Sequence, residues 1–301
     1  MRTSAPLALA RGLAGSFVIV IALAAMVGIG IPLASGLGDG TFAARLIPAV
    51  IMGAVTLALL MLLLRLQRRP WRFAGVVGTA KLLGGFGLGI ATMTASAILM
   101  FGLFTALGMI DWGPVDVATL GLFILTNAVI ALLLEAIPEE VVMRGYVQSS
   151  LGERFGRLLT IALTTGFFLL APFSFVLGQS VVASFISGVW TPTLTPNGEH
   201  VAEYYILLAV FGVTLSLARW ATPSHSIGTS IGAHLAYLTI ARIAVSKDSD
   251  VTGVTITLLG PDAILVVPLV IVVAAVGFWW MGRRASTSSA TASGSQPQAS
   301  D

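Results

Sequence analysis

The chain has no cysteine among its 301 residues. Disulfide bonds, thiolate metal sites and cysteine nucleophiles are therefore excluded, and any metal would need histidine or carboxylate ligands. Charged residues make up only 10% of the chain, and histidine occurs three times. The net charge of +3 does not indicate nucleic-acid binding, because the basic residues lie beside apolar runs and form no aromatic-rich basic patch.

Apolar residues, in contrast, are abundant. The chain is 56% hydrophobic, with a mean hydropathy of +0.97. A membrane-spanning helix needs about 20 mostly apolar residues. The sequence therefore predicts an all-α polytopic membrane helix bundle of about eight transmembrane helices, near residues 14–35, 46–64, 82–107, 117–137, 158–178, 203–218, 226–245 and 262–281.

The basic residues predict how this bundle is oriented. Lysine and arginine gather on the cytoplasmic side of membrane proteins. A cytoplasmic N-terminus leaves only Arg45 and Lys247 outside and Arg242 within a span. It places inside Arg2, Arg11, Arg65, Arg68, Arg69, Arg72, Lys81, Arg144, Arg154, Arg157, Arg219, Arg283 and Arg284. We therefore expect a multi-pass protein of the cell membrane, surrounded by the lipid bilayer, with both termini cytoplasmic.

The end of the chain differs in composition from the rest. The segment "ASTSSATASGSQPQASD", residues 285–301, is small and polar and has no hydrophobic periodicity. Such a segment has nothing to bury, so we expect it to be disordered. Residues 1–284 are predicted to form a single transmembrane domain.

An acidic passage, "EAIPEEVVMRGYVQ", follows the predicted fourth span. Helical periodicity places Glu135 with Glu139 on one stripe and Glu140 with Arg144 on a neighbouring one. Pro138 is expected to kink or restart the helix, because it has no N–H to donate. On spacing alone, Glu140 and Arg144 could form an ordinary surface pair. Acidic groups at bilayer depth cost roughly 2.5–3.5 kcal/mol, however, and usually mark a polar cavity.

The stretch "EEVVMRGYVQ" resembles the first motif of the CPBP family, the CAAX prenyl protease and bacteriocin-processing intramembrane peptidases. "SIGTSIGAHLAYL" resembles the third motif of that family, with His234 in the histidine position. In the second motif Phe168 matches the aromatic position, but Pro172 stands where a histidine is expected. Leu238 occupies the asparagine position of the third motif. The resemblance covers about residues 114–245.

This resemblance implies an intramembrane endopeptidase acting on a peptide or membrane-protein substrate in a cavity that opens toward the cytoplasm. It implies that Glu139 activates a water molecule, that Glu140 and Arg144 arrange the helix, and that His234 orients the water or stabilises the oxyanion. The family also implies a divalent metal such as zinc. A catalytic zinc normally has three protein ligands, whereas Glu139 and His234 supply two, so the metal stays open.

Two other functions stay open at this point. Pro172 and Leu238 are compatible with a weak or inactive family member that acts as a membrane scaffold or binds a partner. A transporter could instead use Glu135, Glu139 and Arg242 as a charge relay. The default expectation for Arg242 is that it extends outward to the membrane surface.

Two glycine-rich stretches are interpreted as helix packing. "GTSIG", Gly228 to Gly232, lies within an apolar helix and not at a strand-to-helix turn, so we interpret it as a close-packing G-x-x-x-G face. "GGFGLG", Gly84 to Gly89, has no preceding strand and is interpreted in the same way.

Overall fold

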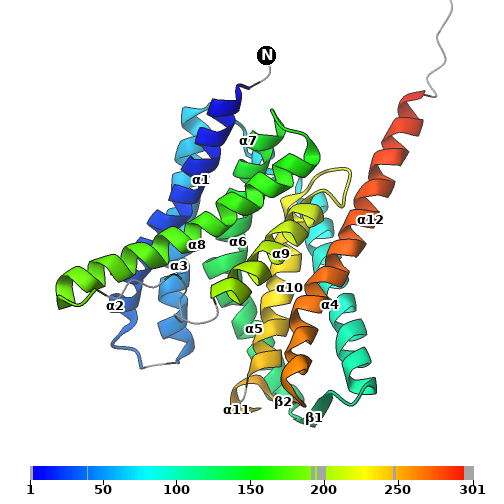
Figure 1. Ribbon diagram of the computed structural model, residues 1–301. Helices are drawn as coiled ribbons and strands as arrows, with labels where there is room; N and C mark the ends of the chain where they lie inside the picture. The colour runs from blue at the N-terminus through cyan, green and yellow to red at the C-terminus, as the bar shows by residue number, and fades with distance from the viewer. Residues whose placement is uncertain (1–2, 39, 191–193, 195–200, 247–248, 295–301) are drawn as a thin grey trace, which may run out of the picture.

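The computed structural model describes residues 3–38, 40–190, 194, 201–246 and 249–294. Figure 1 shows a bundle of long helices that alternate in direction, with the start of the chain and the end of the last helix at the same end of the bundle. That arrangement agrees with an even number of crossings. The long helices are α1 (Ala5–Ala25), α3 (Phe42–Leu66), α4 (Thr79–Ala106), α5 (Val117–Ala131), α8 (Arg157–Ser187), α9 (Val201–Arg219), α10 (Ile227–Val245) and α12 (Val266–Gly294).

Seven helical segments in the described part of the chain are long and apolar enough to cross a membrane. They are Ala5–Ala34, Phe42–Leu66, Trp71–Ala106, Val117–Gly152, Arg157–Val181, Val201–Arg219 and Pro261–Ala285. The predicted polytopic helix bundle is therefore confirmed, while the count of eight and the cytoplasmic placement of the termini stay predictions. The segment predicted as an additional span, 226–245, forms α10.

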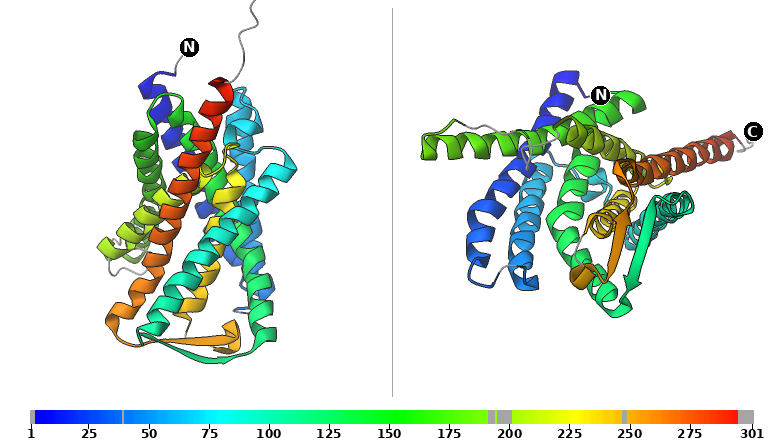
Figure 2. Two further views of the ribbon diagram at one scale, coloured as in Figure 1. Left: turned by 90° about the vertical axis from the view of Figure 1, so that its right-hand side faces the viewer. Right: turned by 60° about the horizontal axis from the view of Figure 1, so that its bottom comes forward.

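Helix α10 lies at the centre of the bundle, as Figure 2 shows. It packs against α4, α5, α9 and α12, and every residue from Ile227 to Tyr237 is buried. A helix that is covered by protein on all sides needs no continuous apolar surface toward lipid. This explains why serine, threonine and histidine side chains occur along it.

Glycines bring the backbones of α4 and α10 together. A Cβ atom on Gly232 would lie 2.1 Å from the carbonyl oxygen of Phe86, and one on Gly89 would lie 2.1 Å from the carbonyl oxygen of Thr229. Each atom met is main chain and can move only with its helix. The interpretation of both glycine-rich stretches as packing faces is thus confirmed.

Replacing Gly232 with alanine should destabilise the protein, because the two helices would have to separate. Overpacking of this kind typically costs about 1–3 kcal/mol. The measurement is thermal unfolding of the purified protein in detergent. Gly84→Ala is the matched control, since a Cβ there meets nothing within 4 Å; equal melting temperatures for the two variants would contradict the packing role.

The helix that carries the acidic passage continues beyond residue 137 and does not restart at Pro138, so that part of the prediction is wrong, while the predicted kink stays a prediction. Helix α5 continues through the π-helical turn η3 (Leu132–Ala136), α6 (Ile137–Glu139), the π-helical segment η4 (Glu140–Val147) and α7 (Gln148–Gly152). A π turn changes the hydrogen-bond register just where proline supplies no N–H, so the helix passes Pro138. At 1.5 Å per residue, Glu139 lies about 20 Å from the end at Gly152 and thus well inside the bundle.

A small antiparallel sheet adds to the predicted all-α fold. Strands β1 (Ile110–Val115) and β2 (Val254–Leu258) pair with Ile110 opposite Leu258. Figure 1 places them at the end of the bundle opposite the start of the chain. The sheet ties the connection before α5 to the one before α12 and lies far from the polar interior.

The remaining elements are short. They are the π turn η1 (Met26–Gly30), α2 (Ile31–Ala34), the 3₁₀ turn η2 (Trp71–Ala74), α11 (Ser249–Thr252) and the 3₁₀ turn η5 (Pro261–Leu265). At the C-terminus α12 continues to Gly294, although disorder is predicted from residue 285. A helix that is already nucleated by a span can propagate into this segment, although serine, threonine and glycine are less favourable in helices than alanine. Residues 295–301 of the predicted tail lie outside the described residues.

Candidate functional site

A cavity of about 220 Å³ lies inside the bundle. Its walls come from α1, the acidic helix, α8, α9 and α10. The lining is mostly apolar, with two carboxylates, one imidazole and two phenols. It comprises Ile19, Leu23, Glu135, Glu139, Met143, Phe168, Ala171, Pro172, Tyr204, Leu207, Leu208, Phe211, His234, Tyr237 and Leu238.

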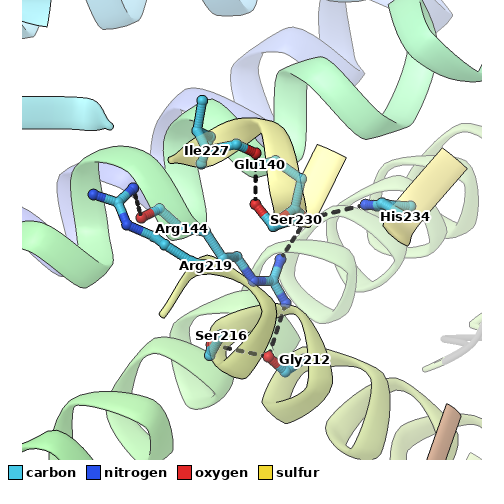
Figure 3. Close-up of polar contacts among 8 residues, drawn as sticks. All are labelled: Glu140, Arg144, Gly212, Ser216, Arg219, Ile227, Ser230 and His234. Carbon is cyan, nitrogen blue, oxygen red and sulfur yellow. Dashed lines mark hydrogen bonds and ion pairs between the residues drawn. The ribbon is translucent and has the colours of Figure 1, made fainter. Parts of the chain in front are cut away.

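Behind the cavity wall, Glu140 joins two helices through one carboxylate oxygen. Its Oε1 atom lies 3.0 Å from Nη1 of Arg144, one helical turn later, and 3.0 Å from Nδ1 of His234 on α10. Figure 3 shows this arrangement. The side chains of Glu140 and Arg144 are fully buried, and His234 is 2% exposed. The spacing of Glu140 and Arg144 therefore produces a buried ion pair and not a surface pair.

Arg144 is held on its other side as well. Its Nη2 atom donates to the carbonyl oxygen of Gly212 at 3.3 Å, and its guanidinium lies 4.2 Å from the ring centroid of Phe168. A Cβ atom on Gly212 would lie 3.4 Å from Nη2, so the small residue on α9 lets the arginine reach the main chain. Phe168, the aromatic residue of the second motif, thus packs on Arg144, the arginine of the first motif.

A second buried arginine, Arg219 of α9, supports the π-helical segment. Its Nη1 atom donates to the carbonyl oxygens of Arg144 and Ala74, and its Nη2 atom donates to the hydroxyl of Ser149 at 2.9 Å. Gln148 donates to the carbonyl oxygen of Ser216 at 3.2 Å. Buried main-chain carbonyls need hydrogen-bond donors, and Arg219 supplies one from the neighbouring helix α9. The sequence pattern indicated only that Arg219 lies at the end of a span.

Glu139 faces the cavity and is separated from the buried pair. Consecutive residues on a helix point about 100° apart, so Glu140 binds inward while Glu139 lines the open space. The side chain is half-buried. Among the described residues no side chain makes a hydrogen bond or an ion pair with it. Its carboxylate is therefore the acidic group best placed to meet a bound molecule.

His234 is oriented by Glu140 and not by Glu139, with which it was expected to act. With Nδ1 engaged by the carboxylate, Nε2 is the ring nitrogen left for the cavity. Phe211 packs edge-on against the imidazole with ring centroids 4.9 Å apart, which fixes the ring plane. Of the four predicted site residues, Glu140, Arg144 and His234 are in contact, and Glu139 lines the same cavity as His234.

The residues present do not fit a zinc ion held by three protein ligands. No group of three or more histidine, aspartate or glutamate side chains placed to hold a metal occurs in the described part of the chain. Pro172 and Leu238 present only apolar atoms to the cavity. The Oε1 atom of Glu140 is already shared between Arg144 and His234. The polar groups that line the cavity are therefore two carboxylates, one imidazole and two phenols.

Two tyrosines on the cavity wall escaped the sequence analysis. Tyr237 follows His234 by three residues on the same helix face, and Phe211 packs on both rings, with a centroid distance of 4.5 Å to Tyr237. Tyr204 of α9 lines the same cavity as Glu139 and Glu135. These phenols bring hydrogen-bond donors into a cavity that otherwise has few.

Arg242 was expected to extend outward to the membrane surface, but its side chain contacts two residues of the acidic helix instead. Its Nη1 atom lies 2.6 Å from Oδ1 of Asn127, and its Nη2 atom forms an ion pair with Glu135. Asn127 in turn donates to the hydroxyl of Thr239 at 3.0 Å. This ion pair compensates the charges of both side chains. Two of the three residues considered for a charge relay, Glu135 and Arg242, are therefore engaged with each other.

A family model described as type II CAAX prenyl endopeptidase Rce1-like matches residues 120–240. Neither the comparison with curated proteins nor that with solved structures gave a significant match. The matched range contains the acidic passage, Phe168 and His234, and it lies within the predicted 114–245.

Proposed function

Since residues 120–240 belong to the CPBP family of CAAX protease-like membrane peptidases, we propose that this chain is an intramembrane endopeptidase of the cell membrane. The observation that carries the proposal is the position of Glu139. Its carboxylate opens into the cavity that His234 also lines, and the imidazole of His234 is held by Glu140, which in turn pairs with Arg144. A base beside a fixed donor or acceptor is the arrangement that hydrolysis of a peptide bond needs.

The reaction follows from these positions. Glu139 accepts a proton from a water molecule as the water oxygen bonds to the peptide carbonyl carbon. The proton then passes to the leaving nitrogen as the carbon–nitrogen bond breaks, and Glu139 returns to its carboxylate form. His234, held through Nδ1, presents Nε2 to the water. Because Glu140 and Arg144 are enclosed, they position the imidazole and take no proton in the reaction.

Tyr237 supplies the donor for the oxyanion in this proposal. The asparagine position of the third motif is Leu238, which has no donor, whereas the neighbouring Tyr237 lines the same cavity. Within the described residues its hydroxyl has no hydrogen-bond partner, and it is not among the fully enclosed polar atoms. It is therefore available to a bound carbonyl.

Tyr237→Phe should lower kcat by about 10²–10³ and leave KM nearly unchanged, because the hydroxyl acts on the developing charge. Tyr205→Phe, a neighbouring phenol that does not line this cavity, is the control and should keep the wild-type rate. A wild-type kcat in Tyr237→Phe would remove Tyr237 from the mechanism.

The direct test of the proposed function uses the purified full-length protein. It is incubated with a farnesylated peptide that ends in Cys-Ala-Ala-X and with the same peptide lacking the lipid, and the products are identified by mass spectrometry. We expect release of the C-terminal tripeptide from the farnesylated peptide, because the matched family model is that of a prenyl endopeptidase. No cleavage of either peptide, or of bacteriocin leader peptides, would count against an endopeptidase.

A second candidate is favoured by one observation, the apolar atoms that Pro172 and Leu238 present to the cavity. A non-catalytic family member would use the same space to hold a helix or peptide of a partner. Crosslinking from Tyr204 that captures an uncut peptide, with no product over the same period, would support this function over hydrolysis.

A further inference from the structure

A second cavity, of about 520 Å³, lies at the end of the bundle where the chain begins. It lies between the start of α8, the turn from α9 to α10, and α12, and it shares no lining residue with the first cavity. Its walls include Phe155, Arg157, Thr160, Trp220, His225 and Gly282. By the distribution of lysine and arginine, this end is the cytoplasmic one.

Arg157 brings a positive charge that no acidic group neutralises within the described residues. Its guanidinium lies 5.2 Å from the ring centroid of Trp220. A Cβ atom on Gly282 would lie 2.9 Å from its Nη2 atom, so the glycine on α12 leaves room for the guanidinium. The nearby Glu153 already pairs with Arg11 and Arg69 at 3.0 and 2.7 Å. The Arg157 side chain is exposed, so the cavity is open to the surface and its guanidinium can meet an anion from outside.

His225 adds a second donor to the same cavity. It has a left-handed backbone with φ of 48°, a conformation that is uncommon for residues other than glycine and that holds the turn before α10 in one shape. His225 is exposed at this turn, and partial desolvation, together with the charges of Arg219 and Arg157, lowers the pKa of its imidazole. The ring can donate at least one N–H to an anion in either protonation state.

We propose that this cavity binds the phosphate headgroup of an anionic phospholipid from the leaflet at that end of the bundle. Arginine forms paired, charge-assisted hydrogen bonds with phosphate oxygens. Basic pockets between membrane helices on the cytoplasmic side are sites for such headgroups. The proposal is independent of peptide hydrolysis.

The surroundings favour a lipid over a soluble anion. Trp279 and Trp280 of α12 are 45% and 49% exposed, and tryptophan is typical of the membrane–water interface. The guanidinium groups of Arg283 and Arg284 lie 4.9 and 3.5 Å from their ring centroids. The cavity therefore opens at the level where headgroups lie, beside further basic residues.

The test measures binding of phosphatidylglycerol and phosphatidylcholine to the full-length protein in neutral detergent, by native mass spectrometry. We expect wild-type protein to bind phosphatidylglycerol more tightly than phosphatidylcholine. Arg157→Gln should weaken the binding of phosphatidylglycerol by about 10-fold or more. Arg157→Lys keeps the charge and should recover part of the binding. Arg65→Gln, which removes an exposed arginine of α3 outside this cavity, should bind as wild type does.

Each other outcome overturns the proposal. Equal binding of the two lipids would show no headgroup selection, and unchanged binding by Arg157→Gln would place the lipid elsewhere. If inorganic phosphate at millimolar concentration displaced the lipid completely, the cavity would be a site for a soluble anion. Circular dichroism of each variant separates loss of binding from loss of fold.

Discussion

Glu139→Gln should reduce peptide hydrolysis by about 10²–10⁴-fold, the contribution of a positioned general base. Glutamine keeps the size and polarity of the side chain but does not accept a proton from water at neutral pH. Glu139 lies on the cavity wall and has no partner among the described side chains, so the fold should tolerate the change. The measurement is the initial rate of product formation from the farnesylated peptide, with thermal unfolding of the same sample.

The control for this variant is Asp111→Asn on β1, an exposed carboxylate at the opposite end of the bundle. It should hydrolyse the peptide at the wild-type rate. If Glu139→Gln retained full activity and a wild-type melting temperature, the base would have to be another group, and the proposed mechanism would be wrong.

Arg144→Met should have the largest effect on stability of any single change at the site. Removing one partner of a buried ion pair leaves the other charge without compensation, which typically costs about 3–5 kcal/mol. Both side chains are fully buried here. The variant also loses the hydrogen bond to Gly212 and the contact with Phe168. The measurement is the free energy of unfolding by denaturant titration in mixed micelles.

The double variant Glu140→Gln/Arg144→Met distinguishes charge from packing. Because it removes the uncompensated carboxylate, it should be more stable than Arg144→Met alone. Arg65→Met, at an exposed position, should change the free energy of unfolding by no more than about 0.5 kcal/mol. A double variant that is less stable than Arg144→Met would indicate that Glu140 contributes through other contacts.

Much of the site could be predicted because its charged and polar residues interrupt long apolar segments. Three carboxylates and an arginine beside a long hydrophobic run, and a histidine within another, stand out in any membrane protein. The four-residue spacing of Glu140 and Arg144 also predicts their contact. What spacing alone did not determine was the environment of that pair, since its burial depends on α8, α9 and α10 closing around it.

Other features depend on contacts between distant parts of the chain. Pro138 normally ends or kinks a helix, and the π turn that lets the helix pass it has no signature in local propensity. Arg219 is indistinguishable in sequence from other arginines at the end of a span, yet it binds the main chain of η4. Arg242 pairs with a glutamate more than a hundred residues earlier.

The sheet had a signal that was available in the sequence. The segment "VTITL" of β2 alternates apolar and polar residues and is rich in β-branched side chains, which favours a strand. Its partner β1 contains glycine and proline, which are depleted in strands. For this reason the sequence did not indicate that the two segments pair. Short strands of this kind form because the two connections meet at one end of the bundle.

The glycine contact between α4 and α10 bears on how a substrate could reach the proposed catalytic groups. Because the two backbones touch at Gly89 and Gly232, separating the helix that carries His234 from α4 would break main-chain packing. The opposite wall of the first cavity is made of side chains such as Ile19 and Leu23 on α1, and these can change rotamer without breaking a main-chain contact. A peptide would therefore enter from the α1 side, where only side chains need to move, and not between α4 and α10, where the two backbones are in contact.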